Sequence, residues 1–146
     1  MNRADRAESL FRQGYNCSQS VFAAFADVLG MTVEEAAGIA SPFGAGFGKL
    51  REVCGAVSGM TLLAGYLKGY SDPTDFEGKK AVYALIQKMC SEFEEKQGSI
   101  ICRELLGLSK GEDLAEPAVR TEEYYQSRPC VKACRIAAEI AEKYCL

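Results

Sequence analysis

The chain has 146 residues, of which 48% are apolar, so it can bury a hydrophobic core of its own and fits the size of one compact domain. Its 17 basic and 20 acidic residues leave a net charge of −3, which provides no basic face for nucleic acid or for an anionic membrane surface. The absence of histidine excludes a Ser-His-Asp triad, a Cys-His dyad and a histidine-ligated zinc site. We therefore predict a single domain spanning residues 1–146, with neither nucleic acid nor membrane as a partner.

The first twenty residues carry charges and lack an apolar stretch followed by small residues, so we expect no secretion signal. The most apolar segment, residues 53–67, is shorter than the roughly 20 residues that a membrane span needs. These features predict a cytoplasmic protein. Because the cytoplasm is reducing and seven cysteines cannot all pair within one chain, we expect thiols, metal ligands or redox groups rather than structural disulfides.

Apolar residues recur at spacings of three and four along the whole chain, which predicts an all-α fold, a compact bundle of about six helices. Residues 4–13 form a first helix. Asn16 can cap a second helix with an inward stripe, and Thr32 with Glu35 resembles a capping box that opens a third helix, ended by Pro42. The inward stripe of the second helix consists of Cys17, Val21, Ala24, Phe25 and Val28.

A glycine-rich loop over residues 42–48 leads into an apolar helix at about residues 52–67. A long amphipathic helix follows at about residues 76–96, and then a short helix around Cys102. Residues 107–129 are the most loop-like, although residues 118–126 could form a turn or two of helix. A last helix runs from Cys130 to the C-terminus. The buried side of the amphipathic helix is predicted to consist of Val82, Leu85, Ile86, Met89 and Phe93.

Two local patterns involve cysteine. Cys54 lies at the start of the apolar helix, where the positive end of the helix dipole favours a thiolate, and Gly55 and Gly59 lie four apart where another helix can approach closely. Cys130 and Cys134 are also four apart, so both face the same side of the last helix. For each pattern the alternative is a seam of small core residues, in which cysteine behaves much like alanine.

Inward-facing cysteines occur on at least four helical segments, as a bundle requires if several sulfurs are to meet at one interior point. The order of motifs resembles the redox-active family named for its cysteine pattern, C_GCAxxG_C_C, over roughly residues 13–144. The resemblance implies that Cys17, Cys54, Cys102 and Cys130 are the signature cysteines and that Cys90, Cys134 and Cys145 are extras. The motifs are Asn16-Cys17, Cys54-Gly55-Ala56-x-x-Gly59, Cys102-Arg103-Glu104-Leu105-Leu106-Gly107 and Cys130.

Three functions are compatible with these residues. In the first, Cys17, Cys54, Cys102 and Cys130 bind a metal or an iron–sulfur cluster; iron–sulfur is preferred over zinc for a redox role, because zinc cannot change oxidation state. In the second, no metal is bound and Cys54 attacks a disulfide or other substrate while another signature cysteine resolves, with Cys54 and Cys102 as the catalytic candidates. In the third, the cysteines are inert core residues of an interaction module. The first two predict an oxidoreductase or an electron-transfer protein with a redox partner protein; the partner, the substrate and the oligomeric state stay open.

Overall fold

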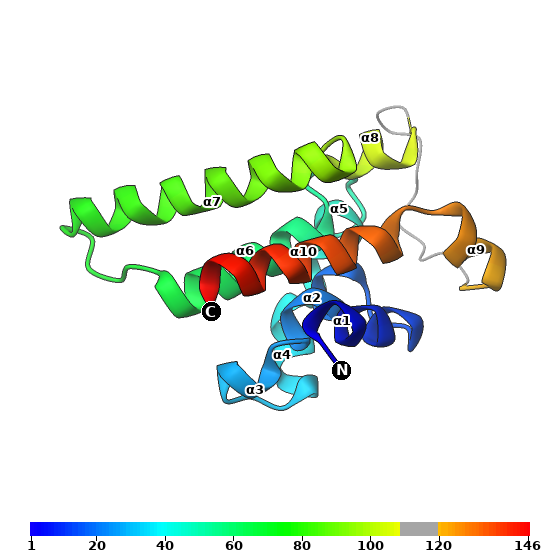
Figure 1. The fold of residues 1–146 in the computed structure, drawn as a ribbon, viewed down its shortest axis with the longest axis horizontal. Coiled ribbons are helices and arrows are strands. Elements are labelled where there is room, and N and C mark those ends of the chain that lie inside the picture. The colour runs from blue at the N-terminus through cyan, green and yellow to red at the C-terminus, as the bar shows by residue number, and fades with distance from the viewer. Residues whose placement is uncertain (109–119) are drawn as a thin grey trace.

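The computed structural model describes residues 1–108 and 120–146, and within these ranges the fold is all-α, as predicted (Figure 1). No β-strand occurs in the described ranges; a single antiparallel bridge joins Val53 and Ile101. Short segments between the main helices raise the number of helical elements above the predicted six. The α-helices are α1 (Arg3–Arg12), α2 (Cys17–Ala23), α3 (Ala26–Leu29), α4 (Val33–Ala40), α5 (Gly44–Phe47), α6 (Gly55–Lys68), α7 (Phe76–Gln97), α8 (Cys102–Leu106), α9 (Glu122–Ser127) and α10 (Cys130–Cys145), with a 3₁₀ turn at Ser41–Phe43.

Side-chain caps determine where several helices begin. The Asn16 side chain accepts a hydrogen bond from the Gln19 backbone, while the Gln19 side chain accepts one from the Asn16 backbone, so α2 starts at Cys17. Thr32 and Glu35 form the predicted capping box of α4. These reciprocal bonds satisfy backbone donors that have no partner inside the helix.

The second helix is shorter than predicted. α2 ends at Ala23, and after a break the separate helix α3 continues to Leu29. Phe25 lies at the break with a non-helical backbone and is fully buried. The break changes which side chains of the following helix face the core. Val28 is therefore 38% exposed, contrary to its predicted inward position, and Leu29 is buried instead.

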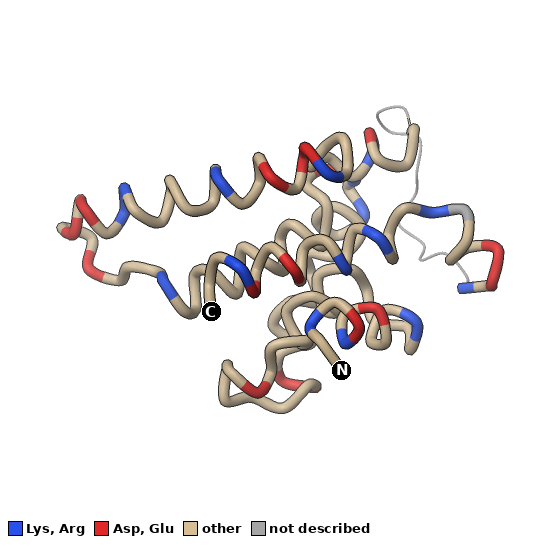
Figure 2. The backbone as a smooth tube through the Cα atoms, in the orientation of Figure 1, with Lys and Arg blue, Asp and Glu red and all other residues tan. Residues whose placement is uncertain are grey.

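The apolar helix α6 lies at the centre of the molecule, against α2 and α10 (Figure 1). Its only charged residue is Lys68, at its last position, so the rest of the helix is drawn in tan in Figure 2. Gly59 permits the close approach of α2 that its spacing predicted, because a Cβ atom there would lie 2.8 Å from the Ser18 carbonyl oxygen. One hydrophobic cluster links α1, α2, α4, α6, α7 and α10.

The long helix α7 runs beside α6 and α10 and contributes little to the core (Figure 1). Of its predicted buried side, Met89 and Phe93 are buried, whereas Val82, Leu85 and Ile86 are only half-buried. Glu92 connects α7 to the end of α10. Its carboxylate accepts a hydrogen bond from the Tyr144 hydroxyl at 2.7 Å and forms an ion pair with Lys143 at 2.9 Å.

The last helix, α10, begins at Cys130 and is buried along one side, as predicted. The helical turn predicted at residues 118–126 corresponds in part to α9, while residues 118 and 119 lie outside the described ranges. None of the helices in the described part of the chain combines the length and apolar character that a membrane span requires.

Candidate functional site

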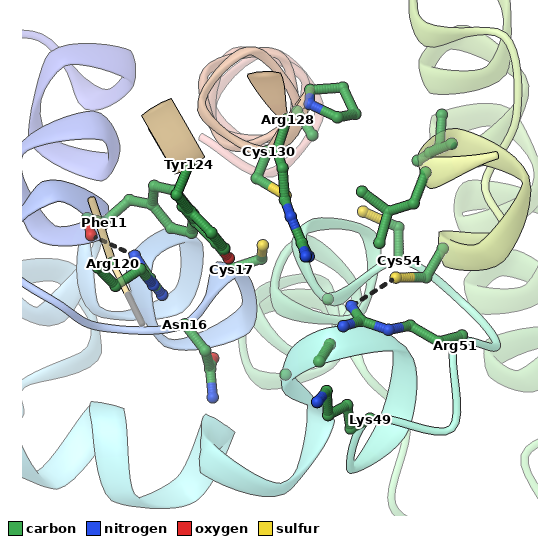
Figure 3. Close-up of a pocket in the computed structure, with 18 of the residues that line it drawn as sticks. Phe11, Asn16, Cys17, Lys49, Arg51, Cys54, Arg120, Tyr124, Arg128 and Cys130 are labelled. Carbon is green, nitrogen blue, oxygen red and sulfur yellow. Dashed lines mark hydrogen bonds between the residues drawn. The ribbon is translucent and has the colours of Figure 1, made fainter. Parts of the chain in front are cut away.

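A pocket of about 370 Å³ lies where several helices begin, and all four signature cysteines line it. Cys17 is the first residue of α2, Cys54 precedes α6, Cys102 is the first residue of α8 and Cys130 is the first residue of α10. The labelled cysteines 17, 54 and 130 surround the same space in Figure 3. Sulfurs from four distant parts of the chain therefore meet around one cavity. Their roles as ligands or catalysts remain predictions.

On one side of the pocket, Cys17 lies between two cysteines of α10. The Cys134 sulfur donates to the Cys17 carbonyl oxygen at 3.9 Å, and side-chain interactions with Cys130 and Cys134 both affect the pKa of the Cys17 thiol. Both interactions are possible because Cys130 and Cys134 are one helical turn apart. Cys134 is therefore a fifth thiol next to the pocket, which the four-cysteine pattern omits and the i, i+4 spacing could have revealed.

On the other side, backbone hydrogen bonds hold Cys54 and Cys102 in adjoining segments. The Cys54 amide donates to the Ile100 carbonyl at 2.7 Å, and the Cys102 amide donates to the Glu52 carbonyl at 2.6 Å. These bonds flank the bridge between Val53 and Ile101. The positions of the two sulfurs are thus coupled through the main chain. Cys90 and Cys145, by contrast, do not line this pocket.

The glycine-rich segment, which includes the short element α5, forms a compact left-handed turn rather than an open loop or a regular right-handed helix. Positive φ angles occur at Ala45, Phe47, Lys49 and Arg51 as well as at two glycines of the segment. The turn brings backbone close to the cysteines: a Cβ atom on Gly46 would lie 2.7 Å from the Cys102 Cβ atom, and one on Gly44 would overlap the Asn16 side chain. The sequence predicted a glycine-rich loop here but not its left-handed backbone.

Four basic residues line the pocket together with the cysteines: Lys49, Arg51, Arg120 and Arg128. No Asp or Glu lines it within residues 1–108 and 120–146. Figure 3 shows the side chains of Arg51 and Arg128 reaching into the space that the cysteines surround. The net charge of −3 for the whole chain did not predict this local positive charge, because net charge carries no information on where the charged residues lie.

Arg120 builds one wall of the pocket. Its guanidinium donates to the carbonyl oxygens of Phe11 and Tyr15 at 2.9 and 3.0 Å and lies 4.2 Å from the centre of the Phe11 ring. The wall also includes Tyr124, whose ring lies 5.1 Å from the same guanidinium. Arg120 thus anchors the segment before α9 to α1, over the side of the pocket that Cys17 and Cys130 occupy.

The thiols of the site hold their protons tightly. Burial raises the pKa of Cys54 to about 12, and the backbone amides of Ala56 and Val57 oppose this rise only in part. Burial also raises the pKa of Cys102, against the effect of Arg51. The prediction that the helix dipole favours a thiolate at Cys54 is therefore wrong for the free thiol, because desolvation of a side chain only 5% exposed outweighs the dipole.

The other two signature cysteines behave similarly. The pKa of Cys17 lies well above its usual value: the contact with Cys130 lowers it, but the contact with Cys134 and burial outweigh that effect. The contact with Cys17, followed by burial, raises the pKa of Cys130. All four thiols are consequently protonated near neutral pH unless a metal or a cation replaces the proton.

The cysteines surround a space rather than a single point. In the part of the chain that the structure describes, no three or more cysteine, aspartate or glutamate side chains form a group that could hold a metal ion. A single tetrahedral ion requires its sulfurs to converge at about 2.3 Å from one centre. An iron–sulfur cluster takes four thiolates on several irons, so its ligands need not meet at one point.

Comparison with known proteins identifies one family. Residues 15–144 match the model of the family described as "Putative redox-active protein (C_GCAxxG_C_C)". The match covers the pocket and all four cysteines that line it. No curated protein and no solved structure matches the chain.

Proposed function

The chain belongs to the C_GCAxxG_C_C family, which is described as redox-active, and from its four-cysteine pocket we propose that it is an electron-transfer or oxidoreductase protein that binds an iron–sulfur cluster. Cys17, Cys54, Cys102 and Cys130 are the proposed ligands. The single observation that carries the proposal is that these four thiols, from four parts of the chain, line one pocket. Electrons would be exchanged with a partner protein in the cytoplasm, where all seven cysteines can persist as the free thiols seen here.

The donor set fits such a cluster. Four cysteine thiolates are the ligands of both common cluster types, and a bound cluster would supply one-electron transfer. Zinc fits less well, because it cannot change oxidation state and because no three of the described acidic or cysteine side chains form a group for one ion. The surrounding arginine and lysine side chains offset the negative charge of the thiolates.

The raised pKa values have a direct consequence for binding. Each ligand thiol must lose its proton, so loading of the site releases protons and its affinity rises with pH. Meanwhile Cys54 and Cys102, at 5% and 8% exposure, are largely screened from water by the chain. The chain's own part in the function would be to supply the four ligands from separate segments and to limit solvent access.

The proximity of two thiols favours a second candidate function, metal-free thiol–disulfide exchange. Cys17 and Cys130 both line the pocket, and a side-chain interaction between their thiols affects the pKa of each. If their sulfurs joined, the two thiols would lose two protons and two electrons, and a partner disulfide would be reduced to two thiols. Cys54 is less suited to the attacking role, because its pKa is raised to about 12 and its side chain is buried.

Anaerobic purification after expression with added iron tests the proposal. We expect a visible chromophore, with iron and acid-labile sulfide in similar amounts. Cys17→Ser, Cys54→Ser, Cys102→Ser and Cys130→Ser should each abolish or strongly reduce it. The matched controls Cys90→Ser and Cys145→Ser should retain it, because neither residue lines the pocket.

Two results would overturn the proposal of an iron–sulfur cluster. One is zinc without sulfide. The other is a colourless wild-type protein that forms a Cys17–Cys130 disulfide on mild oxidation, which would establish the thiol–disulfide alternative. Mass spectrometry of unreduced peptides identifies that disulfide.

A further inference from the structure

A buried arginine contacts one of the four cysteine sulfurs. Arg51 is only 8% exposed, and its Nη1 atom donates a hydrogen bond to the Cys102 sulfur at 3.5 Å, marked by a dashed line in Figure 3. Arginine is rarely buried unless its donors are used. This hydrogen bond brings a full positive charge to a proposed ligand atom.

The backbone around Arg51 holds this contact in place. Arg51 has a φ of +60°, in the left-handed region, and its amide donates to the Ala45 carbonyl at 3.3 Å. Its own carbonyl accepts from the Arg103 amide at 3.1 Å, directly after Cys102. Gly46 packs against both partners, because a Cβ atom there would lie 2.6 Å from the Arg51 Cα atom and 2.7 Å from the Cys102 Cβ atom.

The left-handed turn does more than reverse the chain direction, because it also positions the Arg51 side chain. Non-glycine residues adopt positive φ at a cost, and such backbone persists where the surrounding structure imposes it, often at functional sites. Here the turn and the bridge between Val53 and Ile101 place the guanidinium beside the sulfur. Arg128 lines the same pocket, and its guanidinium lies 4.7 Å from the centre of the Tyr124 ring.

We propose that Arg51 is a positioning residue that raises the reduction potential of the cysteine site by donating to the Cys102 sulfur. This inference rests on the proposed function. Reduction adds one negative charge to the site, and a fixed positive donor at a ligand sulfur stabilises the reduced form more than the oxidised form. No bond of Arg51 or Cys102 forms or breaks in this step, and Arg51 keeps its proton throughout.

A redox titration of the loaded protein tests the inference, with dithionite as the electron donor and absorption as the readout. Arg51→Met removes charge and donors while keeping an unbranched side chain. At a fixed potential we expect it to lower the ratio of reduced to oxidised protein at least tenfold, which is about 59 mV for a one-electron couple. Arg51→Lys keeps the charge without the planar fork and should give a smaller shift in the same direction.

Arg103→Met is the matched control. Arg103 lies next to Cys102 in the chain but pairs with Glu52, at 2.5 Å, instead of donating to a sulfur. The same change of side chain there should leave the midpoint nearly unchanged. Iron content per chain and thermal unfolding of every variant show whether a shift arises from loss of the site or of the fold.

The outcomes separate this inference from the proposed function. An unchanged midpoint in Arg51→Met, with normal iron content, overturns the role of Arg51 and leaves the cluster standing. Loss of iron in both Arg51 variants but not in Arg103→Met overturns it too, because Arg51 would then serve assembly. A wild-type protein without iron and sulfide overturns the proposed function and this inference with it.

Discussion

Cys17 and Cys134 are 117 positions apart in the chain, yet the Cys134 sulfur donates to the Cys17 carbonyl oxygen at 3.9 Å. The contact arises because α2 and α10 pack together and each places a cysteine at the shared surface. It makes Cys134 an immediate neighbour of the four-cysteine pocket, although the family pattern does not include it.

Cys134→Ala distinguishes a ligand from a neighbour. Cys134 is fully buried and close in size to alanine, so we expect a small loss of stability, about 1 kcal/mol, and an iron content equal to that of the wild type. Cys130→Ser, one turn earlier on the same helix, should lose the iron. Chemical unfolding and metal analysis measure both effects. Loss of iron in Cys134→Ala would instead identify a fifth sulfur that the site requires.

Alkaline pH should destabilise the metal-free protein through Cys54. The pKa of Cys54 rises from the ordinary 9.0 to about 12 on folding, mainly through burial. Above pH 9 the unfolded chain loses the proton while the folded chain keeps it, so the free energy of unfolding falls as pH rises from about 9 to about 12.

Comparison with Cys54→Ser isolates this contribution. Between pH 8 and pH 10 the wild type should lose about 1.4 kcal/mol more than the variant, because one pH unit of this range lies within the window and each unit there is worth about 1.4 kcal/mol. Urea unfolding at the two pH values gives the difference. Identical pH dependence in the two proteins would show that Cys54 is not desolvated in the folded state.

Two glycines of α6 should respond to alanine in opposite directions. At Gly59 the added methyl group would lie 2.8 Å from the Ser18 carbonyl oxygen and 3.0 Å from the Val21 Cβ atom, so Gly59→Ala should cost about 1–3 kcal/mol. At Gly65 the same methyl group meets nothing within 4 Å, and Gly65→Ala should stabilise the protein by about 0.5–1 kcal/mol. Thermal unfolding tests both. A neutral Gly59→Ala would mean that α2 and α6 can move apart freely.

The left-handed turn allows the reverse experiment. Ala45 has a φ of +56°, which is unfavourable for alanine and costs glycine little, so Ala45→Gly should raise the free energy of unfolding by about 0.5–1 kcal/mol. Ala84 is exposed in the middle of α7, where glycine should lower stability by about 1 kcal/mol. Urea unfolding compares the two variants, and a destabilised Ala45→Gly would contradict the left-handed backbone at this residue.

Much of the fold is readable from local chemistry. The caps at Asn16 and Thr32 start α2 and α4 where predicted, and α10 begins at Cys130 as its pattern indicated. The prediction of one continuous helix from Cys17 through Val28 was wrong, because the helix breaks at Phe25. The full burial of Phe25 is determined by neighbours from other helices. Short-range periodicity carries no information on such contacts.

Composition and spacing by themselves determined the all-α class, most helix starts, the absence of histidine chemistry and the four cysteines worth following. Only the tertiary structure decided that these cysteines share a pocket, that Cys134 adjoins it, that Arg51 contacts Cys102 and that burial keeps Cys54 protonated. The division has a physical reason: helix caps and periodicity act over a few residues, whereas desolvation and charge contacts depend on which distant segments pack together.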